Sequence, residues 1–399
     1  MPTPAEPDGS PPMSARRFSL LLTSFAGIVA IAVAAVPSLN FLHGAALVAR
    51  ASGMHGEWPE RIARFDAVSF DVSDLQVPSR AGPLRARLYT PARPTSRTLV
   101  LTPGVHMDGI DEPRLVKFAR DFAASGLAVL TPELPDLLEY RVTPRLPDLI
   151  EDAVGWASRQ RRLARDGRVG LVGISFAGGL SVVAAGRPSI RDRVAFTMSF
   201  GGHGDLPRTL NYLCTGIQAD GAARPPHDYG VAVILLNAAP LIVPAGQADG
   251  LVEGILTFLR ASSIDMYDKP RARVEFDRAR AMAERLPEPS ATLLRHVNAR
   301  DVSALGRVLM PYVDAYAGDA ALSAMRSPAP RGPVLLLHGA DDNVIPAVES
   351  RWLGDYLTRR GTPTQVLITP LITHAEIDRP PSVGEVVRMV RFWTALVSR

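Results

Sequence analysis

The sequence predicts an α/β fold, in which a mostly parallel sheet is covered by helices on both of its faces. Short, continuous apolar runs are typical of strands buried on both sides. They alternate with amphipathic helical stretches over residues 65–202, and the same alternation returns over residues 332–399. Between them, residues 203–331 show mainly helical periodicity. Together these patterns predict one large sheet domain that contains a helical cap insertion.

The composition is that of a globular protein and excludes several classes of function. The chain has 399 residues, of which 47% are hydrophobic and 21% charged, which is enough for a large core. The net charge is +4, and the basic residues are scattered arginines without a basic stripe, so we expect no nucleic-acid partner. Cys214 is the only cysteine, which excludes an intrachain disulfide and a cysteine-based metal site. We expect no cofactor and no metal.

The N-terminal region predicts a membrane anchor or signal segment over residues 16–50, after a disordered tail over residues 1–15. A run without charge extends over residues 18–36 and is long enough to span a bilayer. Because Arg16 and Arg17 precede it, the positive-inside rule places the remaining chain outside the cytoplasm. A cleaved signal and a helix buried in the domain remain alternatives.

The first half of the domain is predicted as an antiparallel strand pair followed by alternating strands and helices. Period-two alternation indicates the pair, and continuous apolar runs indicate the later strands. The expected strands are residues 67–77, 84–89, 98–101, 127–130, 169–172 and 193–199, and the expected helices are residues 113–124 and 147–164.

The second half is predicted as the insertion followed by the end of the sheet domain. Residues 231–243 are so apolar that periodicity does not separate helix from strand, and an independent second domain is an alternative to the insertion. The expected helices of the insertion are residues 250–259, 271–285, 290–298 and 302–316. Beyond a Pro-rich linker, we expect strands at residues 334–337 and 365–368 and helices at 348–360 and 383–397.

A serine stands between an apolar strand and an apolar helix in the stretch Gly173-Ile-Ser175-Phe-Ala177. This pattern is typical of a nucleophile elbow, in which the serine occupies a sharp, strained turn. Side chains two residues before and after the serine must be small, because strand and helix approach closely there. A glycine-rich turn without catalytic function is the alternative interpretation.

A serine hydroxyl needs a base within hydrogen-bond reach, and the base needs an orienting acid. Asp342 directly follows a predicted buried strand and is the candidate acid. His374 follows the last predicted strand and is the only histidine after Asp342, which makes it the candidate base. Asp341 and Asp205 are alternative acids, and Asp342 could instead cap its own turn. We expect His338 to be a structural turn residue, and His203 and His227 to be in the core or in solvent.

These three motifs resemble the α/β-hydrolase superfamily from about residue 65 to the C-terminus, and the insertion is matched least. The resemblance implies Ser175 as nucleophile, His374 as general base and Asp342 as its orienting acid. It also implies an oxyanion hole formed by the backbone N–H groups of Phe176 and Val105. His106, which follows in the same loop, is a candidate pocket residue.

The uncharged N-terminal run and the arginines before it predict a membrane-anchored, extracytoplasmic protein, or one secreted after signal cleavage. The expected reaction is hydrolysis of a carboxylic ester through an acyl-enzyme intermediate. The expected substrate is a small-molecule ester with a hydrophobic part, and the membrane is contacted through the N-terminal segment. A peptidase or an acyltransferase would use the same three residues, and a catalytically silent binding module at the membrane is a further alternative.

Overall fold

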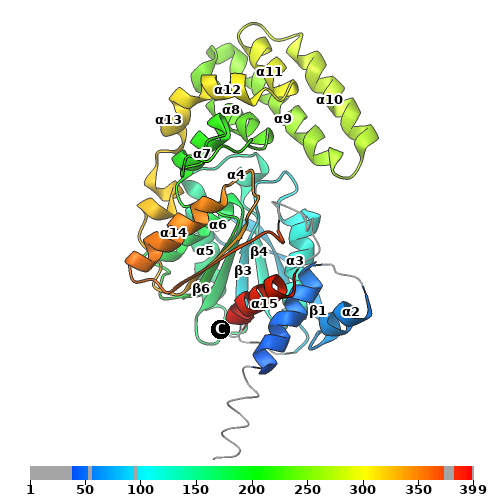
Figure 1. Cartoon of the computed structure of the whole chain (residues 1–399), viewed down its shortest axis with the longest axis vertical. Helices are drawn as coiled ribbons and strands as arrows, with labels where there is room; N and C mark the ends of the chain where they lie inside the picture. Colours follow the sequence, from blue (N-terminus) through cyan, green and yellow to red (C-terminus); the bar gives the residue numbers. More distant parts are fainter. Residues whose placement is uncertain (1–37, 53–55, 94, 96, 373–381, 398–399) are drawn as a thin grey trace, which may run out of the picture.

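The computed structural model describes residues 38–52, 56–93, 95, 97–372 and 382–397. In this part of the chain an eight-stranded sheet forms the centre of the molecule (Figure 1). Its strands are β1 (Phe70–Val77), β2 (Leu84–Pro91), β3 (Thr98–Thr102), β4 (Ala128–Pro132), β5 (Val169–Ile174), β6 (Val194–Phe200), β7 (Val334–Gly339) and β8 (Thr364–Thr369). Their order is β1-β2-β4-β3-β5-β6-β7-β8, and β2 is antiparallel to both β1 and β4. All other neighbours are parallel, so the predicted mostly parallel sheet is confirmed.

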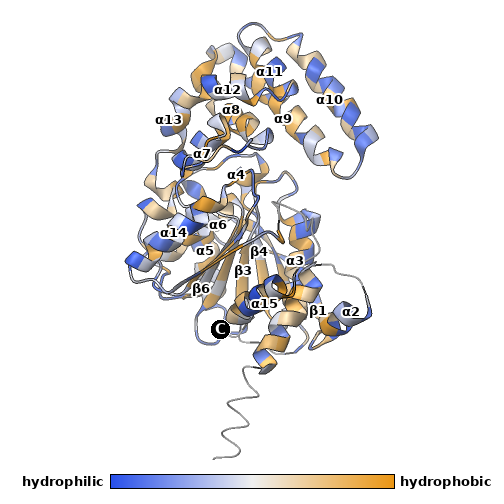
Figure 2. Cartoon of the chain, in the orientation of Figure 1, coloured by the Kyte–Doolittle hydropathy of each residue, from blue (hydrophilic) through white to orange (hydrophobic). Residues whose placement is uncertain are grey.

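Both faces of the central strands are buried, which explains their continuous apolar runs. In β3, Leu99 and Leu101 pack against one layer of helices and Val100 packs on the opposite side, because side chains alternate along a strand. The first layer contains α3 (Pro113–Ala124) and α15 (Val383–Val397). The other contains α5 (Arg145–Arg159), α6 (Phe176–Gly186) and α14 (Ala347–Arg359). Figure 2 shows the apolar strands between these helices.

The helix over residues 38–52 packs on the same face as α15. Leu47 is fully buried in the core, and a Cβ at Gly44 would lie 2.3 Å from Thr394 Oγ1, so the two helices approach closely. Arg50 Nη1 donates a hydrogen bond of 2.7 Å to the carbonyl oxygen of Ala63. The end of the segment predicted as membrane anchor or signal is therefore part of the folded domain, because Ala46, Leu47 and Ala49 are buried there. The large apolar side chains at the start of the helix, Leu39, Phe41 and Leu42, are exposed.

The earlier part of that prediction, including the tail over residues 1–15 and the run over residues 18–36, lies outside the described residues. Of the helices that the structure describes, none is long and apolar enough to cross a membrane.

A set of helices between β6 and β7, here called the inserted helices, follows the carboxyl end of β6 and lies above the sheet in Figure 1. Sequence patterns did not predict the first of them. They are α7 (Leu206–Thr215), α8 (Tyr229–Ile242), α9 (Ala248–Asp265), α10 (Lys269–Ala283), α11 (Ser290–Asn298), α12 (Val302–Leu309) and α13 (Val313–Ala317).

Two stretches of the insertion differ from or refine the expected elements. The ambiguous residues 231–243 are helical, because α8 is surrounded by other helices and buries apolar side chains on all its sides. The single helix expected over residues 302–316 is wrong: a 3₁₀ turn that contains Pro311 separates α12 from α13. Proline lacks the N–H that a continuous helix would use there.

Candidate active site

Ser175 occupies the turn between β5 and α6 with φ +56° and ψ −132°. A positive φ is strained for a residue other than glycine, and such strain gathers at functional sites. Its N–H donates a hydrogen bond of 2.8 Å to the carbonyl oxygen of Phe200 at the end of β6. A Cβ at Gly173 would lie 2.3 Å from the carbonyl oxygen of Ala177 and 2.4 Å from Ser181 Oγ. The turn therefore requires glycine two residues before the serine.

The loop after β3 lies directly against Ser175. A Cβ at Gly104 would be 3.4 Å from the Cβ of Ser175. The next residue, Val105, lines the same cavity as Ser175. Phe176 is the first residue of α6, so its N–H has no acceptor within the helix. Among the described residues, neither the Phe176 N–H nor the Val105 N–H donates to a backbone acceptor. Both are available to an oxygen atom beside Ser175, where the helix dipole favours negative charge.

Asp342 is buried after β7 and has only 3% of its surface exposed. Its Oδ1 accepts hydrogen bonds from the backbone N–H groups of Val344 at 2.8 Å and Ile345 at 3.0 Å. Its Oδ2 lies 3.4 Å from His338 Nε2, and a Cβ at Gly201 would be 3.6 Å from that oxygen. One carboxylate oxygen therefore caps the turn, and the other lies beside Gly201, which lines the same cavity as Ser175.

The two alternative carboxylates have other partners in the structure. Asp341 is exposed and forms an ion pair with Arg224 of the insertion, at 3.3 Å between Oδ1 and Nη1. Asp205 caps α7 by accepting from the Arg208 N–H at 3.1 Å, and it pairs with Arg326 Nε at 2.6 Å. Neither carboxylate lines the cavity that contains Ser175 and Asp342.

The candidate base, His374, lies outside the described residues. The chain leaves β8 after Thr369, and its next described residues, Leu371 and Ile372, line the cavity beside Ser175. The described chain therefore reaches the cavity two residues before His374.

The other histidines have separate surroundings. His203 is fully buried, bonds the Leu322 carbonyl oxygen through Nε2 at 2.8 Å and packs on the Phe176 ring. Burial lowers the pKa of His203, so the ring is neutral. His338 belongs to β7, where it pairs with Ile368 of β8, rather than to the turn expected for it. Its buried ring is enclosed by contacts to Ser350 Oγ and the Ile345 carbonyl oxygen. His227 is exposed and lies two residues before α8 begins.

His106 is the one histidine of the described residues that lines the cavity. Its Nε2 shares a hydrogen bond of 3.1 Å with Ser263 Oγ of α9, and its Nδ1 accepts from the Asp108 N–H. Burial lowers its pKa. The loop after β3 is thereby linked to the inserted helices.

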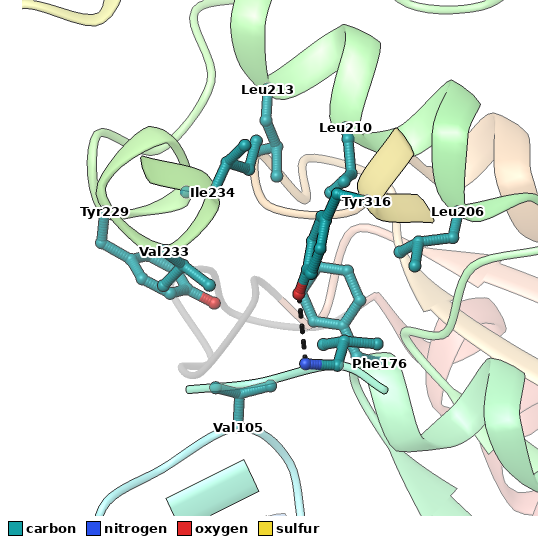
Figure 3. A pocket seen from close by; sticks show the side chains of 11 residues that line it. Val105, Phe176, Leu206, Leu210, Leu213, Tyr229, Val233, Ile234 and Tyr316 are labelled. Atoms are coloured by element: carbon teal, nitrogen blue, oxygen red, sulfur yellow. Dashed lines mark hydrogen bonds between the residues drawn. The ribbon is translucent and has the colours of Figure 1, made fainter. Parts of the chain in front are cut away.

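The cavity around Ser175, here called the main cavity, has a volume of about 820 Å³. Its walls come from α3, α15, the helix over residues 38–52 and the loops that follow the strands. A second, narrow pocket lies between the elbow and the inserted helices (Figure 3). Val105 and Tyr229 line both spaces. Sequence reasoning missed Tyr229, because no motif marks it and it reaches the site only through the packing of α8.

The comparisons with known proteins bear on the fold of the chain alone. No protein-family model matches the sequence, and no curated protein matches it. An esterase from Pyrobaculum calidifontis is 15% identical over 85% of this chain and 89% of its own, with a TM-score of 0.47. A variant of the esterase rPPE is 11% identical over 90% of this chain and 96% of its own, with a TM-score of 0.47.

The acylaminoacyl peptidase of Pyrococcus horikoshii is 13% identical over 86% of this chain and 43% of its own, with a TM-score of 0.44. This chain therefore spans less than half of that peptidase. The mostly parallel sheet, and the strained serine between one of its central strands and the following helix, give the chain the α/β-hydrolase fold.

Proposed function

We propose that the protein is a serine hydrolase that cleaves a carboxylic ester. The observation that carries the proposal is the strained Ser175 at the wall of a cavity that the Asp342 carboxylate also lines. The Gly104–Val105 loop lies against the serine, as an oxyanion site requires. In the proposal, His374 is the general base and Asp342 orients it.

The proposed reaction has two halves. Ser175 Oγ attacks the ester carbonyl carbon while its proton passes to the His374 imidazole, and the Phe176 and Val105 N–H groups stabilise the oxyanion. The imidazolium then protonates the departing alkoxide, which leaves as the alcohol. A water molecule attacks the acyl-enzyme, gives one proton to the imidazole and releases the acid, after which that proton returns to Ser175. Each oxyanion donor contributes roughly 3–4 kcal/mol in comparable sites.

The walls of the main cavity support a substrate with a hydrophobic part. Most of the side chains that line it are apolar, as in sites for small organic ligands, although Glu112, Arg114, Lys117 and Asp121 also line it. The apolar side chains include Leu115, Phe118, Leu371, Met389 and Trp393.

Labelling with a fluorophosphonate probe tests the nucleophile. The wild-type protein should be labelled, and Ser175→Ala should abolish the labelling. Ser189→Ala is a matched control, because Ser189 lies on the surface and donates to Glu151. His374→Ala should also abolish labelling, because the hydroxyl loses its base. Labelling that persists in Ser175→Ala would disprove the assigned nucleophile.

Substrate assays separate the proposal from its rivals. An ester hydrolase should turn over p-nitrophenyl esters much faster than aminoacyl amides, whereas a peptidase should show the reverse. Transfer of the acyl group to an added alcohol in preference to water would indicate an acyltransferase. A wild-type protein that never reacts with the probe would indicate a binding module.

We also propose that the protein is anchored in a membrane with its hydrolase domain outside the cytoplasm. The uncharged run over residues 18–36 and the two arginines before it support this proposal.

A further inference from the structure

Tyr229, the first residue of α8, lies between the two spaces at the candidate site. It lines the main cavity together with Ser175 and Asp342, and it also lines the narrow pocket. Figure 3 shows its hydroxyl oxygen directed into the narrow pocket, above Val105. The ring therefore forms part of the wall between the two spaces.

The Tyr229 hydroxyl makes no hydrogen bond to any described residue. The Tyr229 N–H donates a hydrogen bond of 3.3 Å to His227 Nδ1, and the Tyr229 ring packs against the His227 ring at 5.1 Å. By contrast, the Tyr316 hydroxyl in the same pocket accepts from the Val142 N–H at 3.2 Å. Burial raises the pKa of Tyr229, and the nearby Asp342 carboxylate raises it further. The hydroxyl is therefore protonated at neutral pH and available as a donor.

The two residues that precede Tyr229 hold its chain segment in place. The His227 N–H donates to the Asn343 carbonyl oxygen at 2.8 Å, which ties the start of α8 to the loop of Asp342. Asp228 pairs with Arg300 at 2.5 Å. Because these contacts fix the segment before substrate binds, ordering the tyrosine adds little to the cost of binding.

The narrow pocket lies where the acyl part of an ester would enter. Val105 and Phe176, whose N–H groups are the proposed oxyanion donors, both line it. A carbonyl oxygen bound by these two N–H groups would bring the attached acyl chain to this pocket. The other lining side chains are nearly all apolar, and the free volume of about 10 Å³ holds about one water-sized sphere. The main cavity, at about 820 Å³, has far more room for the alcohol part.

We propose that Tyr229 contacts the substrate and sets its specificity: the ring separates a narrow acyl site from the main cavity, and the hydroxyl donates a hydrogen bond to the ester at their junction. The inference rests on the proposed function and deepens it. The substrate class is an ester of a short, apolar acid with a larger alcohol.

A series of p-nitrophenyl esters from acetate to dodecanoate tests whether the Tyr229 ring limits the length of the acyl chain. The wild type should prefer the shortest acyl chains. Tyr229→Ala and Val233→Ala, which remove atoms that line the narrow pocket, should each raise kcat/KM for octanoate relative to acetate by about tenfold or more. Val231→Ala is the matched control, because Val231 is also a buried valine on α8 but lines neither space. It should leave the chain-length profile unchanged.

Tyr229→Phe tests the hydroxyl separately from the ring. Loss of one hydrogen bond should lower kcat/KM by about 3- to 10-fold for every ester and leave the chain-length preference as in the wild type. Tyr356→Phe, on α14 and away from both spaces, is the control and should retain wild-type kinetics.

Wild-type kcat/KM in Tyr229→Phe, together with an unchanged profile in Tyr229→Ala and Val233→Ala, would overturn the inference. Fluorophosphonate labelling keeps this failure distinct from failure of the proposed function. If Ser175 is labelled and the variants keep the wild-type dependence of kcat/KM on acyl-chain length, the proposed role of Tyr229 is wrong, whereas the proposed hydrolase function is retained. If the wild type is not labelled at Ser175, both proposals fail.

Discussion

The backbone N–H of His227 donates a hydrogen bond to the carbonyl oxygen of Asn343 across 2.8 Å. The Tyr212 hydroxyl donates to the same carbonyl oxygen at 3.2 Å. Helix α7 and the segment before α8 are thus joined to the loop that carries Asp342, although the loop belongs to the sheet domain. The position of this loop depends on packing that no local sequence pattern describes.

Gly173→Ala should destabilise the elbow. The new methyl group would lie 2.3 Å from the backbone oxygen of Ala177, which has no rotamer by which to move away. We expect a loss of about 1–3 kcal/mol in the free energy of unfolding and weaker probe labelling at Ser175. Urea denaturation and labelling rates measure the two effects. Gly246→Ala, which meets nothing within 4 Å, should change neither, and an equally tolerant Gly173 would contradict the tight turn.

Glu349→Ala should be strongly destabilising. The Glu349 side chain is 2% exposed and accepts from Arg208 Nε at 2.5 Å and from the backbone N–H groups of Gly204 and Asp205. Its removal leaves a partly buried guanidinium and two buried N–H groups without their acceptor. We expect a loss of about 3–5 kcal/mol in unfolding free energy, measured by denaturant titration.

The exposed pair between Asp192 and Arg331 provides the comparison for Glu349. Asp192→Ala should cost less than about 1 kcal/mol, because water screens that pair. Equal losses of unfolding free energy in Asp192→Ala and Glu349→Ala would show that burial of the ion pair does not determine the size of the loss.

Asp228 should make the stability of the insertion sensitive to acid. Burial alone would raise its pKa, but the neighbouring His227 and the Arg300 guanidinium outweigh burial and lower the pKa to about 2 from the ordinary 3.8. A lowered folded-state pKa stabilises the fold above about pH 4, and this contribution is lost as pH falls toward 2. Asp228→Asn should therefore be less stable than wild type at pH 6, by at most about 2 kcal/mol. Urea titrations at pH 6 and pH 2.5 should show that difference shrink, and a constant difference would contradict the shift.

Two truncations should behave differently. Removal of residues 1–37 should release the protein from the membrane pellet and leave probe labelling at Ser175 intact. Removal of residues 1–50 also deletes Leu47, which is fully buried, and the Arg50 contact to Ala63. The shorter protein should be less stable by about 2–5 kcal/mol or more, since loss of one buried leucine side chain has that effect. If the protein that lacks residues 1–37 stayed in the membrane pellet, that result would argue against the proposed anchor.

Sequence patterns located most strands and helices because their signals are local. The helix at residues 113–124 coincides with α3, and the closing helix coincides with α15. The sequence alone does not assign the helix at residues 38–52 to the membrane or to the folded domain, because an apolar helix covered by protein has the same hydropathy as one covered by lipid. The break at Pro311 also escaped a prediction based on hydrophobic spacing alone.

By itself, the sequence determined the alternating strands and helices, the small residues around Ser175 and the carboxylate directly after β7, because each depends on neighbours within one turn or strand. Only the tertiary structure decided that Asp342, rather than Asp341 or Asp205, shares a cavity with Ser175, and that Tyr229 lines both this cavity and a narrow pocket. These relationships join residues far apart in the chain. They arise from the packing of the inserted helices over the carboxyl ends of the strands, which hydrophobic periodicity does not encode.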